Sequence, residues 1–200
     1  MQSRTFEKRR LEDMLVRLYD LVDRLLVLVS EGKKSNFSKV EELVASAEEY
    51  RSIIAREATL FIARYQPLAE DLIWSEAVIS VTYDLYRIAR YAREIAILSE
   101  HIGGLRGNVN DDVLELLEVA RVMLRESMEA FLKGKSDIVE EVFRKDDLVD
   151  GIYRKYLDLL GRGEIRGVKD AASLLLARHV ERIADHATYI ARYALRTVSS

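Results

Sequence analysis

Two segments of closely similar sequence decide the fold: YRIARYAREIA at residues 86–96 and ERIADHATYIA at residues 181–191. They match in register at Arg-Ile-Ala, at the next alanine and at Ile-Ala. A repeated segment of this kind indicates an internal duplication. Two unrelated amphipathic helices that are both rich in alanine could also show this similarity because of their composition alone. The breakpoints of the chain fall at matching places in its two halves, however, and this favours duplication.

Outward from these segments, apolar residues recur at spacings of three and four along almost the whole chain, which is the period of an α-helix. Turn residues divide the pattern into six helices. The first three are expected at about residues 5–31, 38–65 and 67–101, with Pro67 in the first turn of the third. Ser35 and Asn36 are available to cap the second helix. The last three are expected from about 111 to 133, from 136 to 160, and from 164 to the C-terminus.

The sixth helix shows how these helices are expected to pack. Six residues fall on one apolar stripe at 100° per residue: Leu176, Val180, Ile183, Ala187, Ile190 and Ala194. Small residues flank the stripe at Ala177, Ala184 and Ala191, and they let neighbouring helices approach closely. The sequence therefore predicts an all-α protein of six long antiparallel helices in two tandem three-helix bundles, residues 1–104 and 105–200.

The composition excludes several functional classes. The 200 residues are 49% hydrophobic and 32% charged, which is typical of a folded chain. The net charge of −3 comes from interspersed basic and acidic residues, so nucleic-acid binding is not expected. There is no cysteine, the N-terminus lacks the features of a signal peptide, and no apolar run approaches the length of a membrane span. We expect a cytoplasmic protein that meets membranes only through a partner.

Two pairs of carboxylates stand one helical turn apart: Asp146 with Asp150, and Glu181 with Asp185. Each pair shares a helix face, and hard cations such as iron, manganese or magnesium take carboxylate ligands. Such pairs are also common on solvated helix faces. The helical wheel places Glu181 and Asp185 opposite the apolar stripe, facing solvent. It places Asp146 and Asp150 on the shoulder of an apolar face, where an unpaired carboxylate is costly.

The histidines do not add a recognised metal motif. His101, His179 and His186 form neither His-Glu-x-x-His nor Glu-x-x-His, which zinc proteases and di-iron bundles use. His179 and His186 lie along the edge of the apolar stripe, where a hydrogen-bonded structural histidine is expected. No glycine-rich phosphate loop is present, so nucleotide binding is not expected.

Three segments resemble the signatures of the PhoU family: RYQPLAEDLI at residues 64–73, DLYRIA at 84–89 and HVERIADHATYIA at 179–191. A fourth, RKDDLVDGIY at 144–153, is similar to the acidic segment of that family. The resemblance covers nearly the whole chain. It implies two three-helix bundles, a homodimer, and acidic motifs that hold metal on the bundle surface. Carried over to this chain, the metal ligands are Asp146, Asp150, Glu181 and Asp185, with iron expected first and zinc, manganese or magnesium as alternatives.

The first repeat departs from this pattern. Tyr86 and Arg90 stand where the sixth helix has Glu181 and Asp185, and an arginine would repel a cation. We therefore predict at most one intact metal site in each chain.

The resemblance also implies a function. It predicts a non-enzymatic negative regulator of phosphate uptake and signalling that docks onto the ATPase of a phosphate ABC transporter or onto a sensor histidine kinase. Two alternatives remain open from the residues alone. One is a metal-dependent enzyme or metal store that uses the acidic cluster, and the other is a helical interaction module that binds no metal.

Overall fold

The computed structural model describes the backbone of residues 2–198 and the side chains of residues 4–33 and 35–197. Within these residues the chain forms six long α-helices and two short 3-10 helices, and no strand. The elements are α1 (Gln2–Ser30), η1 (Lys34–Asn36), α2 (Phe37–Tyr65), α3 (Glu70–Ile102), α4 (Asp111–Lys133), η2 (Ser136–Ile138), α5 (Val139–Gly161) and α6 (Gly167–Val198). The all-α prediction is confirmed.

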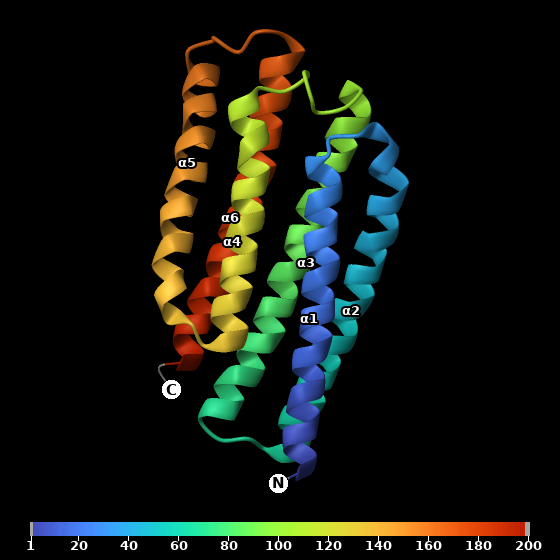
Figure 1. Cartoon of the computed structure of the whole chain (residues 1–200), viewed down its shortest axis with the longest axis vertical. Helices are drawn as coiled ribbons and strands as arrows, with labels where there is room; N and C mark the ends of the chain where they lie inside the picture. The colour runs from blue at the N-terminus through green and yellow to red at the C-terminus, as the bar shows by residue number, and fades with distance from the viewer. Residues whose placement is uncertain (1, 199–200) are drawn as a thin grey trace.

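The helices form two antiparallel three-helix bundles that lie side by side (Figure 1). The first bundle contains α1, α2 and α3, and the second contains α4, α5 and α6. The bundles meet through α3 and α6, which run antiparallel, and through a smaller contact between α1 and α4. Because α6 also packs against α4 and α5, it has neighbours on three sides. The predicted architecture is confirmed.

The two bundles bury corresponding positions, as a duplicated chain should. Leu11, Leu18 and Val22 of α1 match Val113, Ala120 and Leu124 of α4, and Val40, Ala47 and Ile54 of α2 match Val142, Val149 and Tyr156 of α5. All twelve residues belong to one continuous core. The second bundle is inverted end to end relative to the first, since α1 and α4 begin at opposite ends of the molecule (Figure 1).

The start of α3 differs from the prediction. Pro67 was expected in its first turn, but α2 ends at Tyr65 and α3 begins only at Glu70. The backbone of Gln66 turns left-handed, with φ of 45°, and its N–H donates to the carbonyl of Ile62. This closes α2 and leaves Pro67 in the connection, where its missing N–H has no helical bond to disrupt.

The asparagines at the helix starts stabilise more distant contacts than expected. Asn36 and Asn110 occupy the N-cap positions of α2 and α4, but neither side chain caps its own helix. The Asn36 amide instead donates to the Leu28 carbonyl at 2.9 Å, and the Asn110 amide donates to the Tyr156 hydroxyl at 2.8 Å. These asparagines therefore tie a helix start to a neighbouring helix.

None of the helices described here combines the length and the apolar character that crossing a membrane requires.

Candidate metal centre

Three of the four predicted ligands lie on the adjacent helices α5 and α6, near enough for their charges to interact. Asp146 and Asp150 lie one turn apart on α5, and Asp185 lies on α6. The charges of Asp150 and Asp185 both raise the pKa of Asp146, so these three carboxylates share one local field. The apposition of α5 and α6 thus creates a small cluster of negative charge.

Asp146 occupies the least favourable place in this cluster. Burial, and then the charges of Asp150 and Asp185, raise its pKa from the usual 3.8 to about 6. The nearby hydroxyl of Thr188 moderates this shift. Even so, neither Asp146 Oδ1 nor Thr188 Oγ1 has a partner with full hydrogen-bond geometry among the described residues. A buried carboxylate oxygen without a partner is costly, and a cation would remove that cost.

Arginines engage the other carboxylates. Glu181 accepts hydrogen bonds from Arg178 at 2.8 Å and from Arg182 at 2.7 Å. Arg182 also pairs with Asp185 at 2.8 Å, and Arg154 pairs with Asp150 at the same distance. In this arrangement no group of three acidic or histidine side chains in the described part of the chain is placed to hold one ion.

The expectation that Glu181 faces solvent is wrong, because its residue exposure is only 7%. The helical wheel considered one apolar stripe on α6, whereas α6 is the central helix and is covered by α3, α4 and α5. Asp185 is half-buried, and burial together with the charge of Glu181 raises its pKa.

The chemistry of the cluster suits a hard cation, although its present side-chain geometry does not form a coordination sphere. Asp146 has a free oxygen, and Asp150 and Asp185 would each have to exchange an arginine for the ion. Glu181 is held by two arginines and is the least available of the four. The assignment of Asp146, Asp150, Glu181 and Asp185 as metal ligands stays a prediction.

The corresponding place in the first repeat has a different character. Val44 and Glu48 of α2 and Arg90 of α3 line an open groove of about 340 Å³ there. Arg90 donates a hydrogen bond to the Tyr86 hydroxyl at 3.4 Å. Arg90 stands where the second repeat has the carboxylate of Asp185, so a cation in this groove would meet its guanidinium beside the carboxylate of Glu48. The limit of one site per chain stays a prediction.

The two α6 histidines have different environments. His186 is buried and its Nδ1 lies 2.7 Å from the carboxylate of Asp84 on α3, with Tyr91 stacked on its ring at 5.8 Å. This confirms a hydrogen-bonded structural histidine. His179 also lies against Tyr91, but its Nδ1 has no partner among the described residues, and burial lowers its pKa. The pairing of Asp84 with His186 could not be read from the sequence, because it depends on the contact between repeats.

We expect the substitution Asp146→Asn to stabilise the metal-free protein at alkaline pH. The folded pKa of Asp146 lies above its unfolded value, so the native state loses stability as the pH rises from about 4 to about 6. With allowance for solvent screening, the gain should reach at most about 2 kcal/mol at pH 8 and vanish near pH 4. Urea unfolding of both proteins at the two pH values measures it. Asp158→Asn, at an exposed position further along α5, is the control, and an equal gain at both pH values would contradict the assignment.

Comparison with known proteins places the chain in a family. The PhoU domain matches it twice, at residues 9–98 and 113–194. The phosphate-specific transport system accessory protein PhoU homologue of Synechocystis is 28% identical over 92% of this chain and 86% of its own length, and that of Aquifex aeolicus is 28% identical over 88% and 84%. The fold matches crystal structures of PhoU from Pseudomonas aeruginosa (TM-score 0.86, 21% identity, 98% of both chains) and of the phosphate transport system regulatory protein PhoU from Streptococcus pneumoniae (TM-score 0.83, 18% identity, 97% and 96%). With both repeats matched, this chain belongs to the PhoU family.

Proposed function

We propose that this protein is a non-enzymatic negative regulator of phosphate uptake and phosphate signalling. The observation that carries the proposal is the match of the PhoU domain to both repeats, together with relatives that are named accessory proteins of the phosphate-specific transport system. The candidate centre also supports a non-enzymatic role. Asp150, Glu181 and Asp185 are engaged by arginines, so Asp146 has no second free carboxylate beside it to complete an acid–base pair.

The regulator acts by docking to a component of the phosphate transport system, either the ATPase of a phosphate ABC transporter or a sensor histidine kinase. We place it in the cytoplasm as a homodimer, in contact with the membrane only through that partner. Helical bundles of this kind present long faces, against which a helix of a partner protein can dock.

A metal ion at the α5–α6 cluster is part of the proposal. Asp146, Asp150 and Asp185 would hold it, with Glu181 as the fourth predicted ligand, and iron, zinc, manganese or magnesium are the candidates. The ion would supply positive charge among carboxylates that otherwise repel each other. The chain's own contribution is to hold α5 and α6 at a fixed separation, so that ion binding stiffens the surface that they share.

The metal is tested by elemental analysis of protein that is purified without chelator. We expect bound metal in the wild-type chain and its loss in the double variant Asp150→Ala, Asp185→Ala. The control double variant Asp13→Ala, Asp158→Ala removes two exposed carboxylates elsewhere and should keep the metal. Wild-type protein without metal, or equal metal in all three proteins, would contradict the site.

The regulatory role is tested by affinity capture from native lysates of cells grown with abundant and with scarce phosphate, followed by mass spectrometry. We expect recovery of a phosphate-transporter ATPase or a sensor kinase, with an amount that depends on phosphate supply. Capture of neither protein under both conditions would contradict the proposal. Turnover of phosphate esters or oxidation of iron by the purified chain would instead favour the alternative of a metal-dependent enzyme or store.

A further inference from the structure

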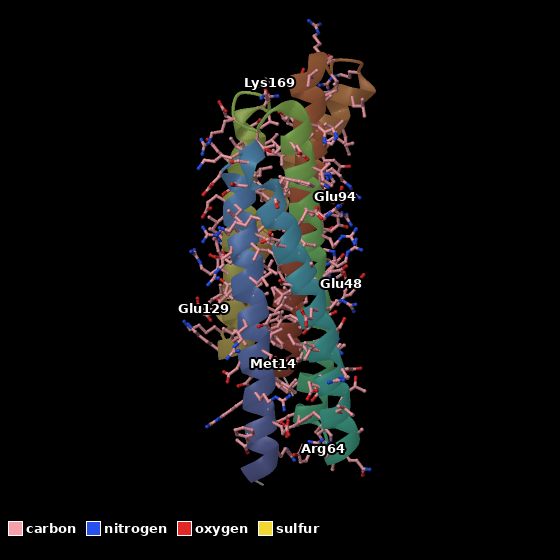
Figure 2. The ribbon with its side chains drawn as sticks, turned by 90° about the vertical axis from the view of Figure 1, so that its right-hand side faces the viewer. Met14, Glu48, Arg64, Glu94, Glu129 and Lys169 are labelled. Carbon is pink, nitrogen blue, oxygen red and sulfur yellow. The ribbon has the colours of Figure 1, made fainter. Side chains whose placement is uncertain are left out.

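A groove with an apolar floor runs between α1 and α2 on the outer edge of the first repeat. Figure 2 looks onto this edge, with α1 in blue and α2 in teal. Two adjoining hollows of about 240 Å³ and 260 Å³ make up the groove, and they share Arg24 and Leu43. Its apolar lining consists of five residues: Leu21, Val27, Leu28, Leu43 and Tyr50.

The rim of this groove carries unpaired positive charge. Arg17, Arg24 and Lys39 line it, and within the described part of the chain none of them has a carboxylate within ion-pairing distance. Asp20 is the one acid among the lining residues. The charge of Lys39 contributes to the lowered pKa of Glu31, but the hydrogen bonds of Glu31 with Asn36 and Lys33 have the larger effect. The groove therefore has an excess of cations that the chain itself does not neutralise.

At the corresponding position of the second repeat, an ion-pair bridge closes the space between the two helices. Glu126, Glu141 and Lys145 of α4 and α5 occupy the positions that correspond to Arg24, Lys39 and Leu43. Lys145 sits between the two glutamates, at 3.0 Å from Glu126 and 2.9 Å from Glu141, and links α4 to α5. In the first repeat the two outer positions carry the opposite charge, and a leucine stands where the second repeat has the central lysine. The first repeat thereby lacks both the counter-ion and the bridge.

We propose that the α1–α2 groove binds an amphipathic helix of a partner protein that carries acidic residues beside its apolar face. Leucines of that helix would cover the floor, and its carboxylates would pair with the three rim cations. The spacing fits this ligand: Leu21 and Leu28 lie seven residues apart on α1, and so do Arg17 and Arg24, which corresponds to about 10 Å along each row. A helix whose apolar residues repeat every two turns presents the same interval.

The shape of the groove favours a helix over an anionic membrane. A membrane surface is met by a convex face with many exposed basic residues, whereas here the apolar residues are recessed between two helices. The inference goes beyond the proposed regulatory role and needs no metal, because the groove lies in the first repeat. Its test uses purified components, so it can fail while the proposed function stands, and the reverse also holds.

The test uses a synthetic, terminally blocked peptide of about 18 residues, long enough for the groove at about 1.5 Å per residue. It carries leucine every three and four positions and glutamate beside the leucines. A fluorescent label reports its binding to the full chain by anisotropy. A second peptide has every glutamate replaced by glutamine. We expect the acidic peptide to bind, more weakly as salt is raised, and the glutamine peptide to bind about tenfold more weakly because three charge pairs are lost.

Three variants locate the binding. The first, Arg24→Glu with Lys39→Glu and Leu43→Lys, imports the closed arrangement of the second repeat and should reduce peptide affinity at least about tenfold. The second, Arg17→Gln with Arg24→Gln and Lys39→Gln, keeps the apolar floor and should lose the salt dependence. The control, Arg9→Gln with Arg106→Gln and Lys169→Gln, changes the net charge as much as the first variant does, at exposed positions outside the groove, and should bind as the wild type does.

Three results would overturn the proposal. The first is absence of binding of the acidic peptide, and the second is equal loss of affinity in the control and in the first variant. The third is a wild-type chain that ignores the peptide but binds vesicles of phosphatidylglycerol and phosphatidylcholine through Arg17, Arg24 and Lys39. Thermal unfolding followed by circular dichroism shows that each variant is folded before its affinity is interpreted.

Discussion

Replacement of His186 by leucine should lower the free energy of unfolding by about 3–5 kcal/mol. His186 and Asp84 are buried between the two bundles, with exposures of 9% and 4%, and they hold α6 to α3 through a contact of 2.7 Å. Burial already raises the pKa of Asp84, and the interaction with His186 partly offsets this effect. Without the histidine, a carboxylate would remain in a low-dielectric interface with no partner. Urea unfolding at neutral pH measures the loss.

A double variant separates the pair from its packing. Asp84→Leu with His186→Leu removes both polar groups, and it should recover at least half of the stability that His186→Leu loses. The loss in the single variant should also grow with pH, because the folded pKa of Asp84 then lies further above its unfolded value and ionisation becomes more costly. Equal losses in the single and double variants, or a loss that is independent of pH, would show that this pair does not control the interface.

Substitution of leucine for Ala184 should lower the free energy of unfolding by about 2–3 kcal/mol. Ala184 is completely buried on α6, which has α3, α4 and α5 as neighbours. The extra side-chain atoms can be accommodated only by moving one of these helices or by an unfavourable rotamer. Chemical denaturation measures the change, and a lowered melting temperature should accompany it.

Ala171 provides the matched control for this substitution. It lies on the same helix near the N-terminal end of α6 and is exposed, so Ala171→Leu should change the stability by no more than about 0.5 kcal/mol. If both leucine variants were equally stable, the close approach of helices around α6 would not matter for folding.

The sequence predicted the fold well because the fold depends on local patterns. The stripe of Leu176, Val180 and Ile183 and the flanking alanines follow the helical period, and the structure buries all of them as predicted. Pro67 was misplaced because the end of α2 depends on a left-handed turn at Gln66, a residue with no special preference for that conformation. A boundary set by one backbone torsion leaves little trace in a pattern of apolar residues.

The candidate site was predicted less completely, for a reason that concerns long-range contacts. The sequence spacing alone predicted that Asp146 and Asp150 share a helix face one helical turn apart, because both residues belong to one helix. The burial of Glu181 and its capture by Arg178 and Arg182 depend on how α6 is enclosed by three other helices. The rim cations of the α1–α2 groove, such as Arg24, were not singled out from the sequence, because their lack of a counter-ion shows only in comparison with the ion pairs of Lys145 in the second repeat.

The inverted arrangement of the two bundles has a topological consequence. α1 begins and α6 ends at the same end of the molecule, whereas the connection between α3 and α4 lies at the opposite end (Figure 1). A linker at that end could therefore join α6 to α1 while the chain is reopened at the exposed residue Arg106. Such a circular permutant would run through the second bundle first and the first bundle last, and would keep every helix contact. The order in which the two bundles are synthesised therefore need not determine how they pack against each other.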